Sequence, residues 1–324
     1  MNHVERLKRK GNFGMSRLLC ILAIIVIFRI PSWGEEACIE TKIEPVPNRI
    51  IAKRLATNEM ELCINLWGIR GHKNDNFKHC IFVNGDELGW TWTKGMTDPE
   101  FIATNGPQAN KIKCMYQFSF PSLLYGVSPH GESTDADNMP VNLNTLESFI
   151  GMHRVEYTAR NLSPGYPGDV YARHSLVYDL FLTTEQPAKG KNVSHSITDE
   201  IIIMMNYNPE YPRLEGCSTQ KSDPIEPNAV FDGYSYYDYH SFDDHNAIGK
   251  NYHQFRRVGG DLSDAAVPEK LDMVPFFKYL KKKHDLQGAW LGQVVIGSQL
   301  YDYTQGEVRF TLRPSFTCRK IKKD

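Results

Sequence analysis

Residues 197–206 read ITDEIIIMMN and set one carboxylate, Glu200, in a run of β-branched and apolar residues. If this run is a strand, its side chains alternate between two faces, so Glu200 shares a surface with Ile202 and Met204. An isolated carboxylate there is costly unless it faces a polar cleft or finds a partner. A perturbed carboxylate in a cleft is a candidate for catalysis. Glu200 is therefore either a catalytic candidate or an edge-strand glutamate that faces solvent.

Short apolar or aromatic runs of the same kind lie on both sides of this stretch, separated by Gly, Pro, Asn and Asp. They occupy residues 62–67, 80–83, 89–93, 111–118, 154–158, 175–182, 229–239, 253–258, 292–298 and 308–312. Many short strands with turn residues between them are typical of a β-sandwich or a β-barrel. The sequence therefore predicts an all-β fold.

One segment has the pattern of a helix. Val274 and Phe277 are spaced by three, Asp272 can cap the helix, and Pro275 falls in the first turn, where its missing N–H is harmless. The lysines at 281–283 suit the negative end of the helix dipole. We expect a single α-helix packed on the β fold.

The ends of the chain divide it into four predicted parts. Basic residues precede the apolar run 18–28, which is typical of a signal peptide, so residues 1–34 are expected to be removed on secretion. This run is short for a bilayer span, although a retained leader that acts as an anchor is the alternative. Residues 35–57 are predicted to form an N-terminal arm, residues 58–318 the domain, and residues 319–324 a basic tail.

Composition narrows the class of partner. The chain has 324 residues, of which 41% are hydrophobic and 23% charged, as in a globular protein. Lys and Arg number 37 against 38 for Asp and Glu, so the net charge gives no argument for a nucleic-acid partner or for a membrane surface. We expect a monomer that binds a neutral ligand, without nucleic acid and without a membrane after signal cleavage.

The cysteines point to an oxidising compartment. Outside the leader, which holds Cys20, they are Cys38, Cys63, Cys80, Cys114, Cys217 and Cys318. This even number is compatible with up to three disulfides, with the pairing open, and the wide spacing favours structural bridges over zinc ligands. Glycosylation sequons at residues 161–163 and 192–194 agree with a secreted, extracellular glycoprotein.

Two polar segments raise the question of a metal. Residues 120–143 carry three prolines and several acidic residues, and are predicted to be a surface loop. Asp135 and Asp137 in that loop lack the spacing of a known calcium loop. The His and Asp residues at 240–245 are explained by a loop of polar residues, which is favoured over a metal site. We predict neither a metal site nor a cofactor.

Five short motifs resemble, in their order, those of glycoside hydrolase family 12, the secreted endo-β-1,4-glucanases and xyloglucanases. They are Asn65-Leu66-Trp67-Gly68, Gly89-Trp90-Thr91-Trp92, Val177-Tyr178-Asp179-Leu180-Phe181, Asp199-Glu200-Ile201-Ile202-Ile203 and Phe276-Phe277-Lys278-Tyr279-Leu280. Each motif is weak alone, but their shared order and spacing between residues 61 and 312 make the resemblance specific. It implies a two-sheet antiparallel β-jelly-roll sandwich with a concave cleft that binds β-glucan. Residues 120–143 are extra relative to the family.

The resemblance also implies roles for single residues. Glu200 takes the position of the catalytic nucleophile, and Asp179 that of the aspartate that hydrogen-bonds it. Asn65 and Trp67 take positions that hydrogen-bond a sugar and stack on it, and an indole covers the C–H face of a pyranose well. For Trp67, a place in the core is the alternative.

Three more aromatic residues are assigned to substrate binding. Trp92 belongs to the W-x-W strand of the resemblance, and Tyr236 and Tyr239 stand near the family's W-x-x-Y strand. An ordinary aromatic strand is the alternative for the two tyrosines.

The chain departs from the family at Gln299, which follows Gly297-Ser298 where the family has the acid/base glutamate of G-T-E. Retaining glycosidases use two carboxyl groups ~5 Å apart, and an amide can neither give nor take the proton. Asp302 and Glu307 are the nearby carboxylates, but a displacement of three residues along a turn usually moves a side chain too far for proton transfer, so rescue by either is the less favoured alternative.

We therefore expect endo-hydrolysis of β-1,4-glucan or xyloglucan with retention, with Glu200, Asp179 and Gln299 at the catalytic centre. The alternative is a catalytically impaired glucan-binding pseudoenzyme. A secreted structural protein with a filled cleft is a third possibility.

Overall fold

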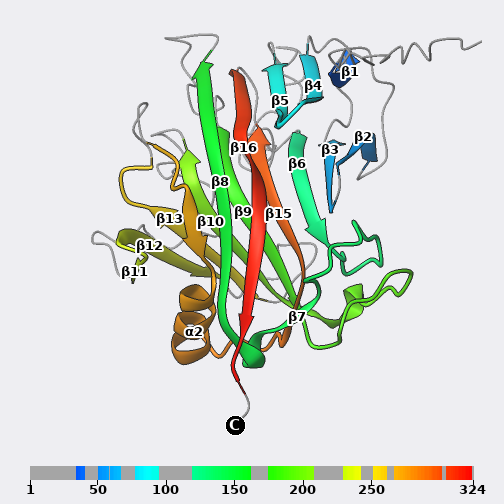
Figure 1. The fold of residues 1–324 in the computed structure, drawn as a ribbon. Coiled ribbons are helices and arrows are strands. Elements are labelled where there is room, and N and C mark those ends of the chain that lie inside the picture. Colours follow the sequence, from blue (N-terminus) through cyan, green and yellow to red (C-terminus); the bar gives the residue numbers. More distant parts are fainter. Residues whose placement is uncertain are drawn as a thin grey trace, which may run out of the picture. The chain divides into compact units, whose positions relative to one another are not determined.

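The structure is a computed structural model in which two β-sheets dominate (Figure 1). The first sheet has the strand order β1-β4-β5-β16-β8-β14, and the second β11-β12-β13-β10-β9-β15-β6-β3-β2, with β7 paired to β15. Paired strands are antiparallel except β10 and β13, which are parallel. The residues that the structure describes are 34–40, 50–57, 59–66, 77–94, 119–161, 174–207, 229–241, 251–260, 266–300 and 304–322.

The strands of the first sheet are β1 (Glu35–Glu40), β4 (Phe77–Asn84), β5 (Glu87–Lys94), β8 (Leu146–Asn161), β14 (Lys270–Asp272) and β16 (Thr304–Lys320). Those of the second sheet are β2 (Ile50–Thr57), β3 (Met60–Leu66), β6 (Ser119–Gly126), β7 (Val141–Asn142), β9 (His174–Thr183), β10 (Ile197–Tyr207), β11 (Ala229–Phe231), β12 (Tyr234–Ser241), β13 (Asn251–Arg257) and β15 (Trp290–Leu300). Two short 3-10 helices are η1 (Leu143–Thr145) and η3 (Ser194–Ser196). The predicted all-β fold with two sheets is confirmed.

The predicted helix is confirmed as α2 (Val274–Lys283), with Pro275 in its first turn and three lysines in its last. Its N-cap is Met273 rather than Asp272. The Asp272 carboxylate nevertheless accepts the N–H of Val274 at 3.1 Å, so it serves one of the unpaired N–H groups of the first turn.

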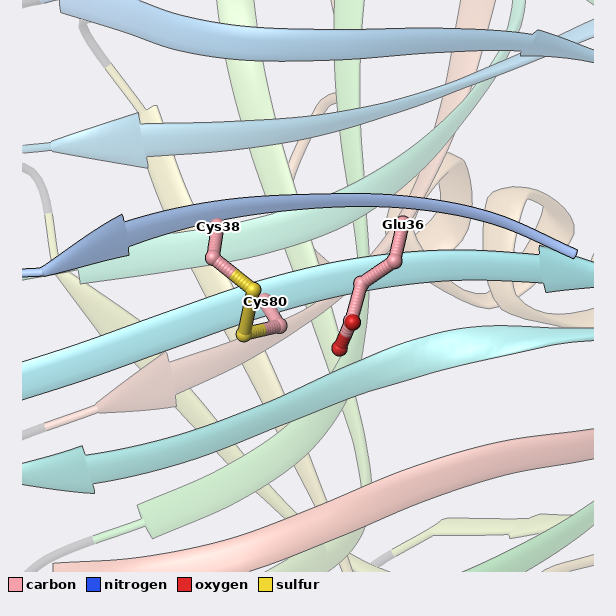
Figure 2. Close-up of side chains that lie close together, drawn as sticks. All are labelled: Glu36, Cys38 and Cys80. Carbon is pink, nitrogen blue, oxygen red and sulfur yellow. A yellow bond between two sulfur atoms is a disulfide. The ribbon is translucent and has the colours of Figure 1, made fainter.

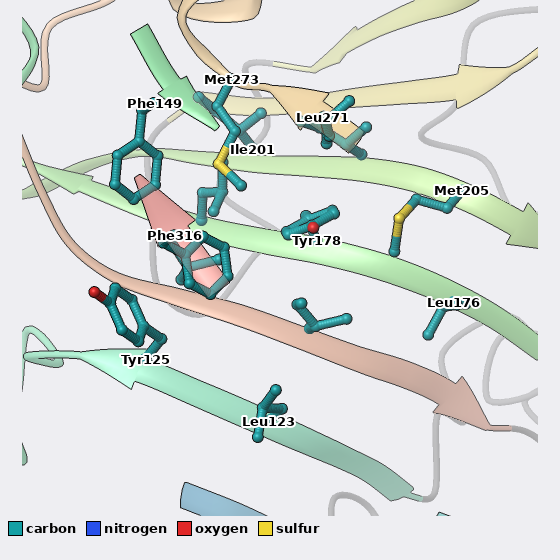
Figure 3. Close-up of a cluster of buried hydrophobic side chains, with 14 of the residues drawn as sticks. Leu123, Tyr125, Phe149, Leu176, Tyr178, Ile201, Met205, Leu271, Met273 and Phe316 are labelled. Carbon is teal, nitrogen blue, oxygen red and sulfur yellow. The ribbon is translucent and has the colours of Figure 1, made fainter. Parts of the chain in front are cut away.

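The core follows from strand alternation. On β9 and β10 every second side chain, such as Tyr178 and Ile201, is fully buried in one cluster with residues of the first sheet (Figure 3). The indole of Trp90 on β5 donates to Ser298 Oγ on β15 at 3.0 Å and so links the two sheets. Each large apolar side chain buried here contributes about 2 kcal/mol to folding.

The prediction that residues 120–143 form a surface loop is wrong for the first part. Strand β6 is buried along its whole length and lies between β15 and β3. Pro121 interrupts only part of the ladder, because the pairing to β15 is broken between Ser122 and Ser119 and the pairing to β3 continues. Proline cannot donate to a ladder and is rare in central strands, so Pro121 stands where the pairing to β15 has a gap.

The chain ends and cysteines add detail to the sequence analysis. Residues of the predicted arm form β1 and β2, which pair with β4 and β3. Cys38 and Cys80 form a disulfide across β1 and β4 (Figure 2), and Cys318 is a free thiol. The upper limit is therefore two disulfides rather than three, since Cys114 and Cys217 lie outside the described residues.

Helix α2 and the chain that follows it are held by one buried carboxylate, Asp238 on β12. It accepts hydrogen bonds from Tyr279 Oη at 2.9 Å, His284 Nε2 at 3.0 Å and Lys283 Nζ at 3.2 Å. Burial alone raises the pKa of Asp238, but these hydrogen bonds outweigh it and hold the pKa below the usual value. We expect Asp238→Asn to lower the free energy of unfolding by about 2 kcal/mol, because all three donors lose the anion to which they bind.

Urea unfolding at pH 7 measures this loss. Asp285→Asn is the matched control, since Asp285 is exposed just beyond the helix and its positive φ suits asparagine. Equal stability of Asp238→Asn and the wild type would show that the carboxylate does not anchor the helix.

Two buried histidines make the fold sensitive to acid. Burial lowers the pKa of His153 and of His174 to about 4 in each case, from 6.5. Between these values the unfolded chain binds protons that the folded chain does not, so stability falls as pH falls through this window. Each histidine contributes up to about 3 kcal/mol of this loss.

Thermal unfolding at pH 7.0, 5.5 and 4.5 tests the prediction. His153→Gln keeps a hydrogen-bonding group near Tyr178 Oη, which lies 2.9 Å from His153 Nδ1, and should flatten the dependence of Tm on pH. His195→Gln is the control on an exposed histidine. An unchanged slope in His153→Gln would contradict the assignment.

Candidate active site

The second sheet carries a separate set of side chains on the face opposite the main core. A smaller apolar cluster there includes Phe120, Val177 and Met204. A pocket of about 590 Å3, counting its part open to solvent, lies on this face and is lined by residues of β3, β6, β9 and β15. We call this side of the second sheet the pocket face.

Glu200 and Asp179 lie together on the pocket face, as the resemblance implies. Glu200 pairs with Phe181 across β10 and β9, and Asp179 pairs with Ile202, so the two carboxyl groups are diagonal neighbours. They are 9% and 4% exposed. Burial raises the pKa of Glu200 well above its usual value, and the charge of Asp179 raises it further. Glu200 therefore holds its proton to a higher pH than an exposed glutamate.

Gln299 does not lie opposite Glu200, which corrects the expected catalytic centre. It pairs with Ser175 of β9, whereas Glu200 pairs with Phe181, six residues further along the same strand. Six residues of β-strand span roughly 20 Å. That separation is far beyond the ~5 Å between the two carboxyl groups of a retaining glycosidase. The Gln299 amide instead accepts a hydrogen bond from Ser175 Oγ at 3.1 Å.

Gln293 on β15 lies level with Glu200 on β10, with β9 between them. The β9–β15 register shifts between Leu291 and Val294, so that Gly292 and Gln293 both stand against Phe181. Such a bulge re-aims a side chain and is frequent beside active sites. Gln293 lines the pocket together with Asp179, and sequence motifs gave no sign of it. The residue of β15 that is level with Glu200 across β9 therefore carries an amide and not a carboxyl group.

Asn65 and Tyr239 lie on the same face as the carboxyl pair. Asn65 on β3 is 4% exposed and lines the pocket with Asp179. Tyr239 on β12 pairs with Gln254, which pairs with Ile202, so these side chains form a row across the sheet. The ring centroid of Tyr239 is 4.1 Å from the guanidinium carbon of Arg256. Trp67 lies outside the described residues.

Trp92 and Tyr236 are in the core and cannot line the pocket, which corrects two expected substrate-binding residues. Each is 1% exposed and belongs to the cluster between the sheets. The Trp92 indole donates to Thr304 Oγ1 at 3.0 Å, and Tyr236 packs edge-on against Phe276 of the helix. The sequence could not say which face of each strand is the inner one.

Glu307, one of the two alternative acids, is excluded by position. It is on β16 in the first sheet, pairs with Thr91 and Thr158, and binds Arg309 at 2.7 Å. Asp302, the other alternative, lies outside the described residues.

A wall of the pocket comes from the turn after β6, which sequence analysis treated as surface loop. Ser128, Pro129, His130 and Glu132 line the pocket with Asp179 and Gln293. The turn residues gave the signal for a loop, but only the pairing of Gly126 with Gln293 brings that loop to the site.

Ligand-type side chains gather at one other place among the described residues. Glu36, Cys38 and Cys80 bring their ligand atoms within 4.8 Å of one another (Figure 2). Both sulfur atoms belong to the disulfide, so neither is a thiolate ligand. Asp135, a calcium candidate in the sequence, binds Lys189 Nζ at 2.7 Å instead. His240 has no described side chain, and residues 243–245 lie outside the described part.

Comparison with solved structures identifies the architecture. A family 12 xyloglucanase from Bacillus licheniformis in complex with ligand has a TM-score of 0.59 at 16% identity, over 88% of this chain and 100% of that one. The fold is that of family 12 glycoside hydrolases. The family 12 resemblance read from the sequence is thereby confirmed in the fold.

Other family 12 structures agree. The endoglucanase of Rhodothermus marinus has a TM-score of 0.54 at 17% identity, over 89% of this chain and 100% of that one. The xyloglucanase domain of a type three effector from Sinorhizobium fredii, in complex with cellobiose, has a TM-score of 0.52 at 13% identity, over 90% of this chain and 100% of that one. No family model and no curated protein matches the sequence. Within the described residues, no helix is long and apolar enough to cross a bilayer.

Proposed function

We propose that this chain is a glycoside hydrolase that cleaves β-1,4-linked glucan or xyloglucan internally, with retention, on the pocket face. The observation that carries the proposal is the buried pair of Glu200 and Asp179 beside the pocket. Two adjacent buried carboxyl groups are costly to the fold. A catalytic role explains such a pair, in which one carboxyl group is the nucleophile and the other orients it. The solved xyloglucanases and endoglucanases of the same fold supply the substrate class.

In this mechanism the Glu200 carboxylate attacks the anomeric carbon, and Asp179 orients and tunes it. Asn65 hydrogen-bonds a sugar hydroxyl, and Tyr239 offers an aromatic surface along the row that crosses the strands. Because burial and Asp179 raise the pKa of Glu200, the nucleophile ionises only toward higher pH. Hydrolysis should therefore increase with pH on the acid side of its profile.

The second candidate is a glucan-binding pseudoenzyme, and the amide at Gln293 favours it. Neither Gln293, opposite Glu200, nor the remote Gln299 has a proton to donate. In that case the pocket face holds the polysaccharide and no bond is broken.

We also propose that the protein is a secreted, extracellular monomer. The support is the basic and apolar leader in residues 1–34, the disulfide of Cys38 with Cys80, and the sequon at residues 192–194. Asn192 is exposed, as the attachment of an oligosaccharide requires.

Two assays on the secreted protein test the proposal. Release of reducing ends from soluble xyloglucan and mixed β-glucan measures cleavage, and retardation in gels that contain the same polysaccharides measures binding. Release of reducing ends by cleavage within the chains supports the hydrolase. Retardation without cleavage supports the pseudoenzyme. If the protein shows neither cleavage nor retardation, the structural protein is the remaining candidate.

A further inference from the structure

The strand register fixes which part of the molecule faces Glu200 across the pocket. A line of paired residues runs from Glu200 through Phe181 and the Gln293 bulge to Gly126, the last residue of β6. The chain leaves the sheet at Gly126, and four residues of the following turn, Ser128, Pro129, His130 and Glu132, line the pocket. The residues that follow Gly126 therefore lie beyond Gln293, at the end of this line that is far from Glu200.

The turn after Gly126 is held by hydrogen bonds from three directions. Val127 N–H donates to Gly292 in the bulge at 2.7 Å, and Val193 N–H donates to Pro129 from the neighbouring loop at 2.7 Å. Within the turn, Ser128 N–H donates to the carbonyl of Glu132 at 2.8 Å. A turn fixed in this way can present a side chain at a defined position.

Glu132 is the carboxyl group that this turn brings to the pocket. The backbone N–H of Glu132 donates to Ser128 Oγ at 3.1 Å, so Ser128 binds both the N–H and the C=O of Glu132. It lines the same pocket as Asp179 and Gln293. Among the residues that the structure describes along this pocket, Glu132 is the carboxyl other than Asp179.

We propose that Glu132 is the catalytic acid/base that Gln293 cannot be. As Glu200 forms its bond to the anomeric carbon, the bond from that carbon to the leaving oxygen breaks, and the Glu132 carboxyl gives its proton to that oxygen. The Glu132 carboxylate then takes a proton from water, whose oxygen attacks the anomeric carbon and frees Glu200. This assignment rests on the proposed hydrolase function.

The test compares two substrates whose leaving groups differ in their need for a proton. Cleavage of xyloglucan releases a sugar alkoxide, which must be protonated as it leaves. Cleavage of 2,4-dinitrophenyl β-cellobioside releases a phenolate, which needs no acid. Glu132→Gln should lose on the order of 10² to 10⁴ in rate on xyloglucan. Its first-turnover release of dinitrophenolate should stay close to that of the wild type.

Asp135→Asn is the matched control, because Asp135 is an exposed carboxylate of the same loop that pairs with Lys189. It should leave both rates unchanged. Full xyloglucan activity in Glu132→Gln, or an equal loss on both substrates, would overturn the assignment. If His130→Asn, and not Glu132→Gln, loses xyloglucan activity while it keeps the rate on the dinitrophenyl substrate, the imidazole of His130 is the proton donor and the assignment to Glu132 is wrong.

The same two substrates separate this inference from the function on which it rests. A wild-type protein active on the dinitrophenyl substrate and inactive on xyloglucan would overturn the role of Glu132 and keep Glu200 as nucleophile. A wild-type protein inactive on both substrates would overturn the hydrolase proposal itself.

Discussion

Glu200→Gln is expected to abolish hydrolysis and, at neutral pH, to make the folded protein more stable. Removing a nucleophile that acts with partner groups costs on the order of 10⁴ to 10⁶ in rate. The pKa of Glu200 is raised in the folded state by burial and by Asp179, so its contribution to stability is full below the unfolded value of 4.5. That contribution is lost as pH rises toward the folded pKa. An amide has no charge to bury, so the variant escapes this loss, which we expect to be about 2 kcal/mol at pH 8.

Urea unfolding at pH 5 and pH 8, together with the reducing-end assay, measures both effects. The gain in stability should be larger at pH 8 than at pH 5, because the raised pKa makes the folded state bind a proton that the unfolded chain loses, and this difference grows as pH rises above the unfolded value. Glu156→Gln on β8 is the control, as Glu156 is an exposed strand glutamate of the other sheet. Equal gains at the two pH values would show that Glu200 is not held protonated by the fold.

Gln293→Glu is expected to restore xyloglucan hydrolysis to the Glu132→Gln protein. The bulge of β15 already aims residue 293 at the pocket, opposite Glu200 across β9. A carboxyl group there has two carboxyl neighbours, and like charges raise a pKa, which suits a general acid. The recovery should approach the factor of 10² to 10⁴ that general acid catalysis supplies.

Gln299→Glu in the same Glu132→Gln background is the matched control. It introduces the same group at the position that the sequence motif favours, but the strand register places it roughly 20 Å along β9 from Glu200. Initial rates on xyloglucan decide between the two positions. Recovery by Gln299→Glu and not by Gln293→Glu would show that the catalytic centre follows the motif rather than the register.

Local sequence pattern was sufficient for much of the fold. The alternation in residues 197–206 placed Glu200 and Ile201 on opposite faces, and the spacing of Val274 and Phe277 gave the helix. These features depend on neighbours within one element. The neighbouring positions of Glu200 and Asp179 were also expected, because the resemblance to family 12 implies that these two side chains meet.

The rest of the site depended on pairing between distant strands. A one-residue bulge at Gly292 and the register of β15 on β9 decide that Gln293, not Gln299, faces Glu200. No local motif encodes that register. In the same way, the sequence of Trp92 and Tyr236 does not tell which side of each strand is the inner one.

The disulfide of Cys38 with Cys80 bears on how the protein behaves at high concentration. Strand β1 has only six residues and forms the outer edge of the first sheet against β4. Strand β4 reads FKHCIFVN, a segment of high β propensity that would pair with other chains if its edge were bare. The covalent link keeps β1 in place on that edge. An oxidising environment therefore protects this fold against aggregation between sheet edges.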